Sequence, residues 1–130
     1  MRISTLKMML REKTNDQLCK KMAIKLAKEF DLEDVILGTE TQLYIKSKSP
    51  SKIYCFGEKP LRLVLRMMGL KHKDIDELRK SKDVFHFNKT DGSILTIYQM
   101  PSIHNILKYG KQELARVVSI LQDSPEKPNV

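Results

Sequence analysis

The stretch LRLVLRMMGLKHKDIDELRK, residues 61–80, decides the interpretation of the fold, because it contains two short helical patterns on either side of Gly69. Pro60 precedes the first pattern, and proline suits the first turn of a helix. Glycine commonly follows the last residue of a helix, so Gly69 predicts the turn between the two. The stretch therefore predicts a helix–turn–helix pair, whose inward-facing positions are Val64, Leu65, Met68, Leu70, Ile75 and Leu78.

The chain before this pair predicts helices and a first hairpin. Residues 2–12 have the spacing of a short helix, and a capping-box pair, Thr14 and Gln17, predicts a second helix over residues 15–30. Residues 35–37 form a short apolar run typical of a strand. Alternating residues in 42–46 and 52–56 predict two strands of a hairpin around a basic loop at 47–51.

The chain after the pair predicts a second hairpin and a helical end. Residues 84–88 and 94–99 have strand character, and Asp91-Gly92 between them is a strong hairpin signal. A last helical region follows, which Gly110 divides, and its second part is an additional C-terminal helix over 111–122. We therefore expect one α+β domain over residues 1–123, with helices around small antiparallel hairpins, and a flexible tail over 124–130.

This order of elements resembles the winged-helix family of DNA-binding domains, with the resemblance covering residues 15–99. The resemblance implies that the helix over 72–80 is the recognition helix and that the turn of the second hairpin is the wing tip. It also implies five contacts to phosphates or base edges, made by Lys73, Arg79, Lys80, Lys82 and Lys89.

Charge also points to a negatively charged partner. The chain has 24 Lys and Arg against 16 Asp and Glu, a formal net charge of +8. The predicted loop at 47–51 adds a second candidate surface, because lysines surround it and aromatic residues lie on its strands. Lysines that bind phosphates beside aromatic faces that stack bases are typical of single-strand binding. The lysines are Lys46, Lys48 and Lys52, and the aromatic residues are Tyr44, Tyr54 and Phe56.

Several kinds of chemistry find no support in the sequence. Cys19 and Cys55 lie far apart in apolar patterns, which predicts buried free thiols in a reducing compartment. The three histidines and two cysteines lack the spacing of metal ligands, and no phosphate-binding loop is present, so we expect no metal and no cofactor. A metal-independent ribonuclease stays an alternative, with His86 and Tyr98 on paired strands and Arg62 or Arg66 near them.

These patterns favour a non-enzymatic, regulatory nucleic-acid-binding protein, with DNA favoured over RNA. The main alternative is a protein-interaction module that modulates a nucleic-acid-processing machine, because carboxylates on the helix over 72–80 oppose the approach of a phosphate backbone. The helix over 111–122 could mediate a homodimer. No run of residues has the length of a membrane span or the pattern of a signal peptide, so we expect a cytoplasmic protein, or a nuclear one in a eukaryote.

Overall fold

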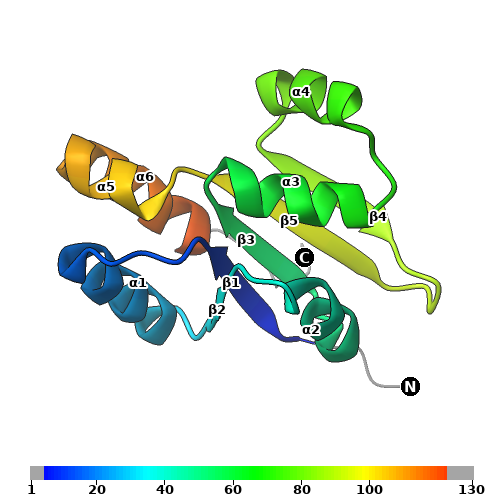
Figure 1. Ribbon diagram of the computed structural model, residues 1–130, viewed down its shortest axis with the longest axis horizontal. Helices are drawn as coiled ribbons and strands as arrows, with labels where there is room; N and C mark the ends of the chain where they lie inside the picture. The colour runs from blue at the N-terminus through cyan, green and yellow to red at the C-terminus, as the bar shows by residue number, and fades with distance from the viewer. Residues whose placement is uncertain (1–4, 123–130) are drawn as a thin grey trace, which may run out of the picture.

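The computed structural model describes residues 5–122, in which helices pack on both faces of one five-stranded sheet (Figure 1). The strands are β1 (Lys7–Arg11), β2 (Glu33–Ile36), β3 (Lys52–Phe56), β4 (Val84–Asn88) and β5 (Ile94–Met100). The helices are α1 (Gln17–Glu29), α2 (Thr41–Lys48), α3 (Glu58–Met67), α4 (His72–Ser81), α5 (Ile103–Tyr109) and α6 (Lys111–Gln122).

The sheet has the order β2-β1-β3-β5-β4, and only the edge strand β4 is antiparallel to its neighbour. The carboxyl ends of β1, β2, β3 and β5 therefore meet at one edge of the sheet, the carboxyl edge, and their amino ends define the opposite amino edge. From β1 the chain crosses through α1 to β2, and it then returns through α2 to β3 on the other side of β1. Open α/β sheets bind ligands at the carboxyl edge, where connections diverge in this way.

Two apolar cores lie on opposite faces of the sheet, because successive side chains of a strand point to opposite faces. In β1, Met8 and Met9 are both fully buried but belong to different cores. Helices α1, α5 and α6 cover the face of Met9, where Tyr54 and Tyr98 stack with ring centroids 4.4 Å apart. Helices α2, α3 and α4 cover the face of Met8 (Figure 1).

The sequence-based predictions for the middle and the end of the chain are confirmed. Helices α3 and α4 are joined at Gly69, whose positive φ of 94° suits glycine. Strands β4 and β5 form the expected hairpin, in which the Asp91 carboxylate accepts hydrogen bonds from the backbone N–H and hydroxyl of Ser93. Gly110 separates α5 from α6. Cys19 and Cys55 are buried free thiols.

The expected helix over residues 2–12 is wrong for its described part, where residues 7–11 form β1. This strand is central, with parallel partners on both sides and helices on both faces. Strands buried on both faces are continuously apolar and do not alternate. Strand β1 contains such a run, Met8, Met9 and Leu10, all of them buried. A short apolar run is also compatible with a helix, so its local pattern does not distinguish the two.

The expected hairpin over residues 42–56 is also wrong. Its first half is α2, in which Thr41 and Ile45 are buried one helical turn apart, and only its second half, β3, is a strand. Ser49 ends α2 with a left-handed φ of 48°, and Pro50 follows it. Because β2 and β3 lie on either side of β1 and run parallel, their connection must cross the sheet, and a helix makes that crossing.

The start of α1 also differs from the expectation. The N-cap is Asp16, whose Oδ1 accepts hydrogen bonds from the backbone N–H groups of Leu18 at 2.8 Å and Cys19 at 3.3 Å. The Thr14 hydroxyl instead accepts a hydrogen bond from the backbone N–H of Asp16 at 3.1 Å. Threonine therefore orders the turn before the helix, and aspartate caps the helix itself.

In its coarse form the α+β expectation is confirmed, since the chain combines helices with a mixed sheet. The winged-helix arrangement of hairpins is not confirmed, because the sheet is mostly parallel and contains one hairpin within the described residues. The expected tail over residues 124–130 lies outside the described residues. No helix within residues 5–122 has the length and apolar character needed to cross a membrane.

Candidate functional site

A polar cleft lies at the carboxyl edge of the sheet, where the chain leaves β1, β3 and β5. Its inner cavity has a volume of about 210 Å³. The segment after β1 forms one wall, Phe56 at the end of β3 forms the floor, and the start of α5 forms the opposite wall. The lining residues are Arg11, Glu12, Lys13, Thr14, Cys19, Phe56, Ser102, Ile103 and His104.

An outer cavity of about 440 Å³ adjoins the inner one, and the two share Glu12 and Ser102 in their walls. We call the two cavities together the carboxyl-edge cleft. The outer cavity extends to the end of α4 and to α6. Its other lining residues are Gly57, Glu58, Arg79, Asp83, Gln99, Met100, Pro101, Asn105 and Arg116.

Gly57 holds the walls of the cleft together. Its backbone N–H donates a hydrogen bond to the Met100 carbonyl at 3.1 Å, which joins the ends of β3 and β5. Its φ of 118° is unfavourable for residues with a side chain, and a Cβ there would lie 3.6 Å from the Ser102 Cβ and 3.8 Å from a Glu12 carboxylate oxygen. These are ordinary contact distances, so the backbone conformation, and not lack of space, favours glycine at this position.

Arg11, the last residue of β1, has its charge neutralised below the cleft. Its guanidinium donates two hydrogen bonds to the Asp34 carboxylate, at 2.8 and 2.9 Å, and the residue is only 5% exposed. This bidentate ion pair ties β1 to β2. We therefore assign Arg11 to the support of the cleft and not to ligand binding.

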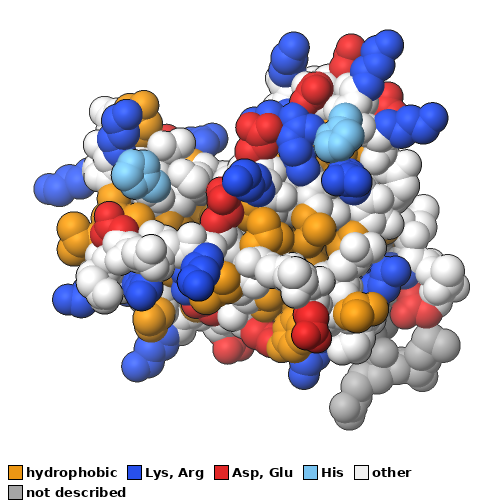
Figure 2. Space-filling model, viewed as in Figure 1, with side chains coloured by type: hydrophobic (Ala, Val, Ile, Leu, Met, Phe, Trp, Pro, Cys, Tyr) orange, Lys and Arg blue, Asp and Glu red, His pale blue; other side chains and the backbone are white. Residues whose placement is uncertain are grey.

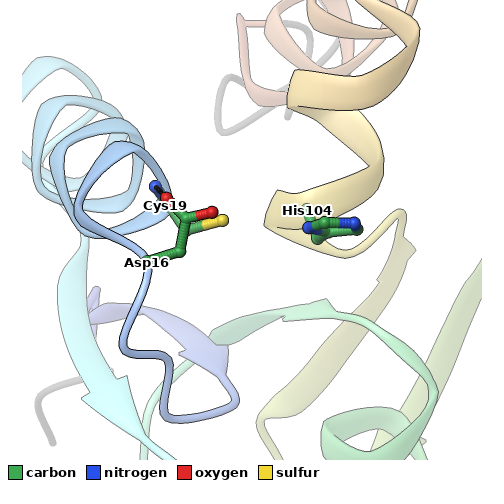
Figure 3. Close-up of side chains that lie close together, drawn as sticks. All are labelled: Asp16, Cys19 and His104. Atoms are coloured by element: carbon green, nitrogen blue, oxygen red, sulfur yellow. Dashed lines mark hydrogen bonds between the residues drawn. The ribbon is translucent and has the colours of Figure 1, made fainter.

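Three side chains with metal-ligating atoms gather beside the inner cavity, and two of them, Cys19 and His104, line it. Asp16 and Cys19 lie on the first turn of α1, and His104 lies at the start of α5 and faces them (Figure 3). One ligand atom from each lies within 4.8 Å of the other two. Ser102 positions His104, because its hydroxyl caps α5 by accepting a hydrogen bond from the Asn105 N–H at 3.1 Å. We call these three residues the Asp16–Cys19–His104 cluster.

The Cys19 thiol is 3% exposed. Burial raises the pKa of this thiol above its usual range, and the negative charge of Asp16 raises that pKa further. Without a bound cation, the thiol is therefore protonated at neutral pH. The sulfur is not a free thiolate nucleophile in this state.

Two guanidinium groups line the outer cavity. Arg79 contacts the Glu58 carboxylate at 3.3 Å, while its Nε is shielded from solvent and has no hydrogen-bond partner within residues 5–122. Arg116 pairs with Glu113 at 2.9 Å and is otherwise exposed. The Gln99 side-chain amide donates hydrogen bonds to the backbone carbonyls of Arg79 and Lys82, which fixes the end of α4 against β5.

Ion pairs within α3 and between α3 and α4 neutralise part of the acidic charge of these two helices. Arg62 pairs with Glu58 at 2.7 Å and with Asp76. These contacts with the Arg62 guanidinium lower the pKa of both carboxyl groups. Asp74 and Glu77 stay exposed on α4, so acidic and basic side chains lie side by side over this helix (Figure 2).

The structure places the residues predicted to bind nucleic acid at opposite edges of the sheet. Arg79, Lys80 and Lys82 lie at the end of α4, beside the carboxyl-edge cleft, and Lys73 lies on the first turn of the same helix. The amino edge carries the others: Lys46 and Lys48 end α2, Lys52 begins β3, and Lys89 lies at the β4–β5 turn.

Lys89 is committed to an internal contact. Its ammonium donates hydrogen bonds to the Pro50 carbonyl at 2.8 Å and to the Ser49 hydroxyl and carbonyl at 3.1 and 3.3 Å. These bonds tie the β4–β5 turn to the loop after α2. Lys48 lies over the Tyr44 ring, 5.6 Å from its centroid.

The geometry bears on two sequence-based interpretations, of base-stacking aromatic residues and of catalytic residues. Tyr54 and Phe56 cannot stack bases from solvent, because they are 0% and 1% exposed in the core. His86 and Tyr98 lie on paired strands, as the ribonuclease hypothesis expected, but Arg62 and Arg66 lie on α3, which covers the opposite face of the sheet from His86. Tyr98 is buried against Tyr54.

Sequence reasoning missed both the carboxyl-edge cleft and the Asp16–Cys19–His104 cluster. The cluster combines residues from two distant segments, so no local spacing reveals it. One usable signal was present: Asp16 and Cys19 are three residues apart at a helix start, a spacing that puts an N-cap carboxylate and a side chain of the first turn together.

Comparison with models of known protein families finds no match, and neither the curated proteins nor the solved structures include one with significant similarity to the chain. The class that the geometry defines is a three-layer protein with a mostly parallel sheet and a polar cleft at its carboxyl edge.

Proposed function

We propose that the protein binds nucleic acid across the carboxyl-edge cleft, with DNA favoured over RNA, and that its role is regulatory. The observation that carries this proposal is the arrangement of basic groups along the cleft. Lys13 lines the inner cavity, and Arg79 and Arg116 line the outer cavity. Lys80 and Lys82 lie at the end of α4, between Arg79 and Asp83 in the chain, and both of these line the outer cavity. A row of basic groups along an open groove suits the phosphates of an extended chain.

Three basic residues at or near this surface have charge available for a ligand. Lys13, Lys80 and Lys82 are exposed and form no ion pair within residues 5–122. The shielded Nε of Arg79 is a donor that a phosphate oxygen could satisfy, and a buried donor without a partner is costly. The net charge of +8 adds a long-range attraction to any polyanion.

A winged-helix mode is the competing geometry for the same function. In that mode α4 enters a groove of the duplex, and the β4–β5 turn contacts the backbone. Its contacts would include Lys73, which has the exposed carboxylates of Asp74 and Glu77 beside it, and Lys89, which bonds the loop after α2. These neighbours weaken the winged-helix mode. Carboxylates of Glu12, Glu58 and Asp83 also line the carboxyl-edge cleft, so the cleft is favoured by its open groove and by the Nε of Arg79, which has no hydrogen-bond partner within residues 5–122.

Two charge-reversal variants test which edge binds. Lys80→Glu with Lys82→Glu alters the carboxyl edge, and Lys46→Glu with Lys48→Glu alters the amino edge by the same change in net charge. Fluorescence anisotropy of labelled duplex DNA, single-stranded DNA and RNA at two salt concentrations gives the affinities. We expect the first variant to lose about tenfold or more in affinity, together with a shallower salt dependence, because each lost phosphate contact removes roughly 0.7–0.9 from the salt slope.

The amino-edge variant is the matched control, since it changes the long-range attraction equally. We expect it to lose only the part of the affinity that depends on net charge. An equal loss in both variants would show that binding follows net charge and not the cleft. A larger loss in the amino-edge variant would move the binding surface to that edge.

The protein-interaction alternative keeps one specific observation in its favour. The exposed side of α4 alternates acidic with basic residues, which suits a protein surface of mixed charge better than a phosphate backbone. Flat anisotropy traces for every nucleic acid at low salt would contradict the main proposal and put this alternative first.

A further inference from the structure

The start of α1 and the start of α5 bring one carboxylate, one thiol and one imidazole together beside the inner cavity, which Cys19 and His104 line (Figure 3). In a tetrahedral zinc site, bonds of about 2.0–2.3 Å place the ligand atoms about 3.3–3.7 Å apart. The observed atoms lie within 4.8 Å of one another. Closing them onto a metal therefore needs shifts of about 1 Å, which side-chain rotation can supply.

Two features prepare these residues to act as ligands. The Asp16 carboxylate is held by the backbone N–H groups of Leu18 and Cys19 through one oxygen, Oδ1, which leaves Oδ2 for another partner. Backbone groups that hold a ligating carboxylate fix its orientation, as outer-shell partners do in metal sites. The negative charge of Asp16 also offsets the partial positive charge of the helix start, which would otherwise oppose a cation.

The donor set selects the kind of metal. Sulfur and nitrogen ligands suit zinc, whereas magnesium and calcium prefer oxygen ligands throughout. Three protein ligands leave a fourth tetrahedral position, and the cluster borders a cavity that can admit a water molecule or an anionic oxygen. Phe56 and Ile103, both buried, supply an apolar floor beneath the site.

We propose that Asp16, Cys19 and His104 bind one Zn²⁺ ion, whose fourth coordination position faces the inner cavity. The site revises the expectation of no metal, which rested on the local spacing of cysteines and histidines. It does not depend on nucleic-acid binding. The zinc would place a fixed positive charge in the inner cavity, where it can hold an anionic oxygen of whatever ligand the cleft takes.

Cobalt substitution tests the site directly. Titration of the full chain with Co²⁺ should give saturable one-to-one binding, visible bands of a four-coordinate ion and a near-ultraviolet thiolate-to-cobalt charge-transfer band. One equivalent of Zn²⁺ should abolish all of these signals. Calorimetric titration with Zn²⁺ itself should give the same stoichiometry.

Three variants separate the ligands. Cys19→Ser should remove the charge-transfer band, and His104→Ala should weaken Zn²⁺ binding at least tenfold without harming the fold, because His104 is exposed. Asp16→Asn keeps a side chain that caps α1 but lacks the carboxylate charge, so it should weaken metal binding while the melting temperature of the metal-free protein stays close to that of the wild type.

Internal controls make the result decisive. Cys55, the other thiol, is fully buried on the opposite face of the sheet and remains in every variant. His86→Ala removes an exposed imidazole away from the cluster and should leave the Zn²⁺ affinity unchanged. The proposal is overturned if the wild type binds no Co²⁺ or Zn²⁺ in a one-to-one ratio. A charge-transfer band that survives in Cys19→Ser, or an unchanged Zn²⁺ affinity in His104→Ala, would overturn it equally.

Discussion

The carboxyl edge and the amino edge of the sheet both carry basic residues, but they use them differently. At the carboxyl edge, Arg79 and Arg116 line an open cleft, and Lys82 is exposed beside it. At the amino edge, the ammonium of Lys89 donates its hydrogen bonds to residues 49–50 and closes the gap between two loops. Lys89 therefore serves an internal contact, whereas the two arginines at the carboxyl edge line an open cleft.

The topology explains this difference. At the carboxyl edge the chain leaves β1 and β3 toward helices on opposite faces of the sheet, so the loops diverge and leave a hollow between them. At the amino edge the loop after α2 and the β4–β5 turn meet directly, and main-chain carbonyls there need donors. The three predictions that follow test these different roles.

The largest effect is expected from the ion pair beneath the cleft. Arg11→Ala leaves the Asp34 carboxylate without the partner that offsets its partial burial. Breaking a buried pair by removing one partner typically costs several kcal/mol, and because Asp34 is partly exposed we expect a loss of about 3 kcal/mol in the free energy of unfolding. Urea denaturation of the wild type and of Arg11→Ala measures this loss.

Arg116→Ala is the control for this prediction, because the Arg116 side chain is exposed whereas that of Arg11 is buried, and their carboxylate partners are equally exposed. The expected loss there is about 0.5 kcal/mol or less. Similar losses in both variants would mean that Arg11 does not have the structural role assigned to it.

A smaller effect is expected at the amino edge. Lys89→Met removes three hydrogen bonds but keeps most of the apolar part of the side chain, and we expect a loss of about 1 kcal/mol in the free energy of unfolding. The matched control is Lys48→Met, on the same edge, which should change stability by only about a few tenths of a kcal/mol. A Lys89→Met variant with unchanged stability and weakened nucleic-acid binding would contradict the structural role assigned to Lys89. It would show that the amino edge also binds nucleic acid.

The smallest effect concerns pH and the ion pairs of Arg62. Because Arg62 lowers the pKa of Glu58 and Asp76 in the folded protein, the stabilisation from these pairs is present above the unfolded pKa values, near pH 4. This stabilisation is lost as the pH falls through the lower pKa values that Glu58 and Asp76 have in the folded protein. Arg62→Gln should therefore be slightly less stable than the wild type at pH 7, and the difference should vanish in strong acid.

Urea denaturation of both proteins at several pH values checks this sign, with Arg66→Gln as the control on the same helix. Both carboxyl groups are exposed, so solvent screens the interaction and the change is small. If the difference in the free energy of unfolding between the wild type and Arg62→Gln grew toward acid pH, Arg62 would not be the group that lowers the pKa values of Glu58 and Asp76.

The sequence by itself determined the parts of the fold that local chemistry controls. Gly69 and Gly110 end their helices, Asp91 and Gly92 make the hairpin turn, and Pro60 lies in the first turn of α3. Each of these signals depends on the conformational preference of one or two residues and needs no distant partner. The basic residues at the end of α4 were also identified from the sequence.

Only the tertiary structure decided which apolar runs are strands and where the cleft lies. Residues 7–11 form a strand because parallel strands satisfy their backbone groups on both sides, and residues 41–48 form a helix because two parallel strands need a connection across the sheet. The Asp16–Cys19–His104 cluster has the same origin. Its members become neighbours because the carboxyl ends of parallel strands meet at one edge, a proximity that no local pattern of residues encodes.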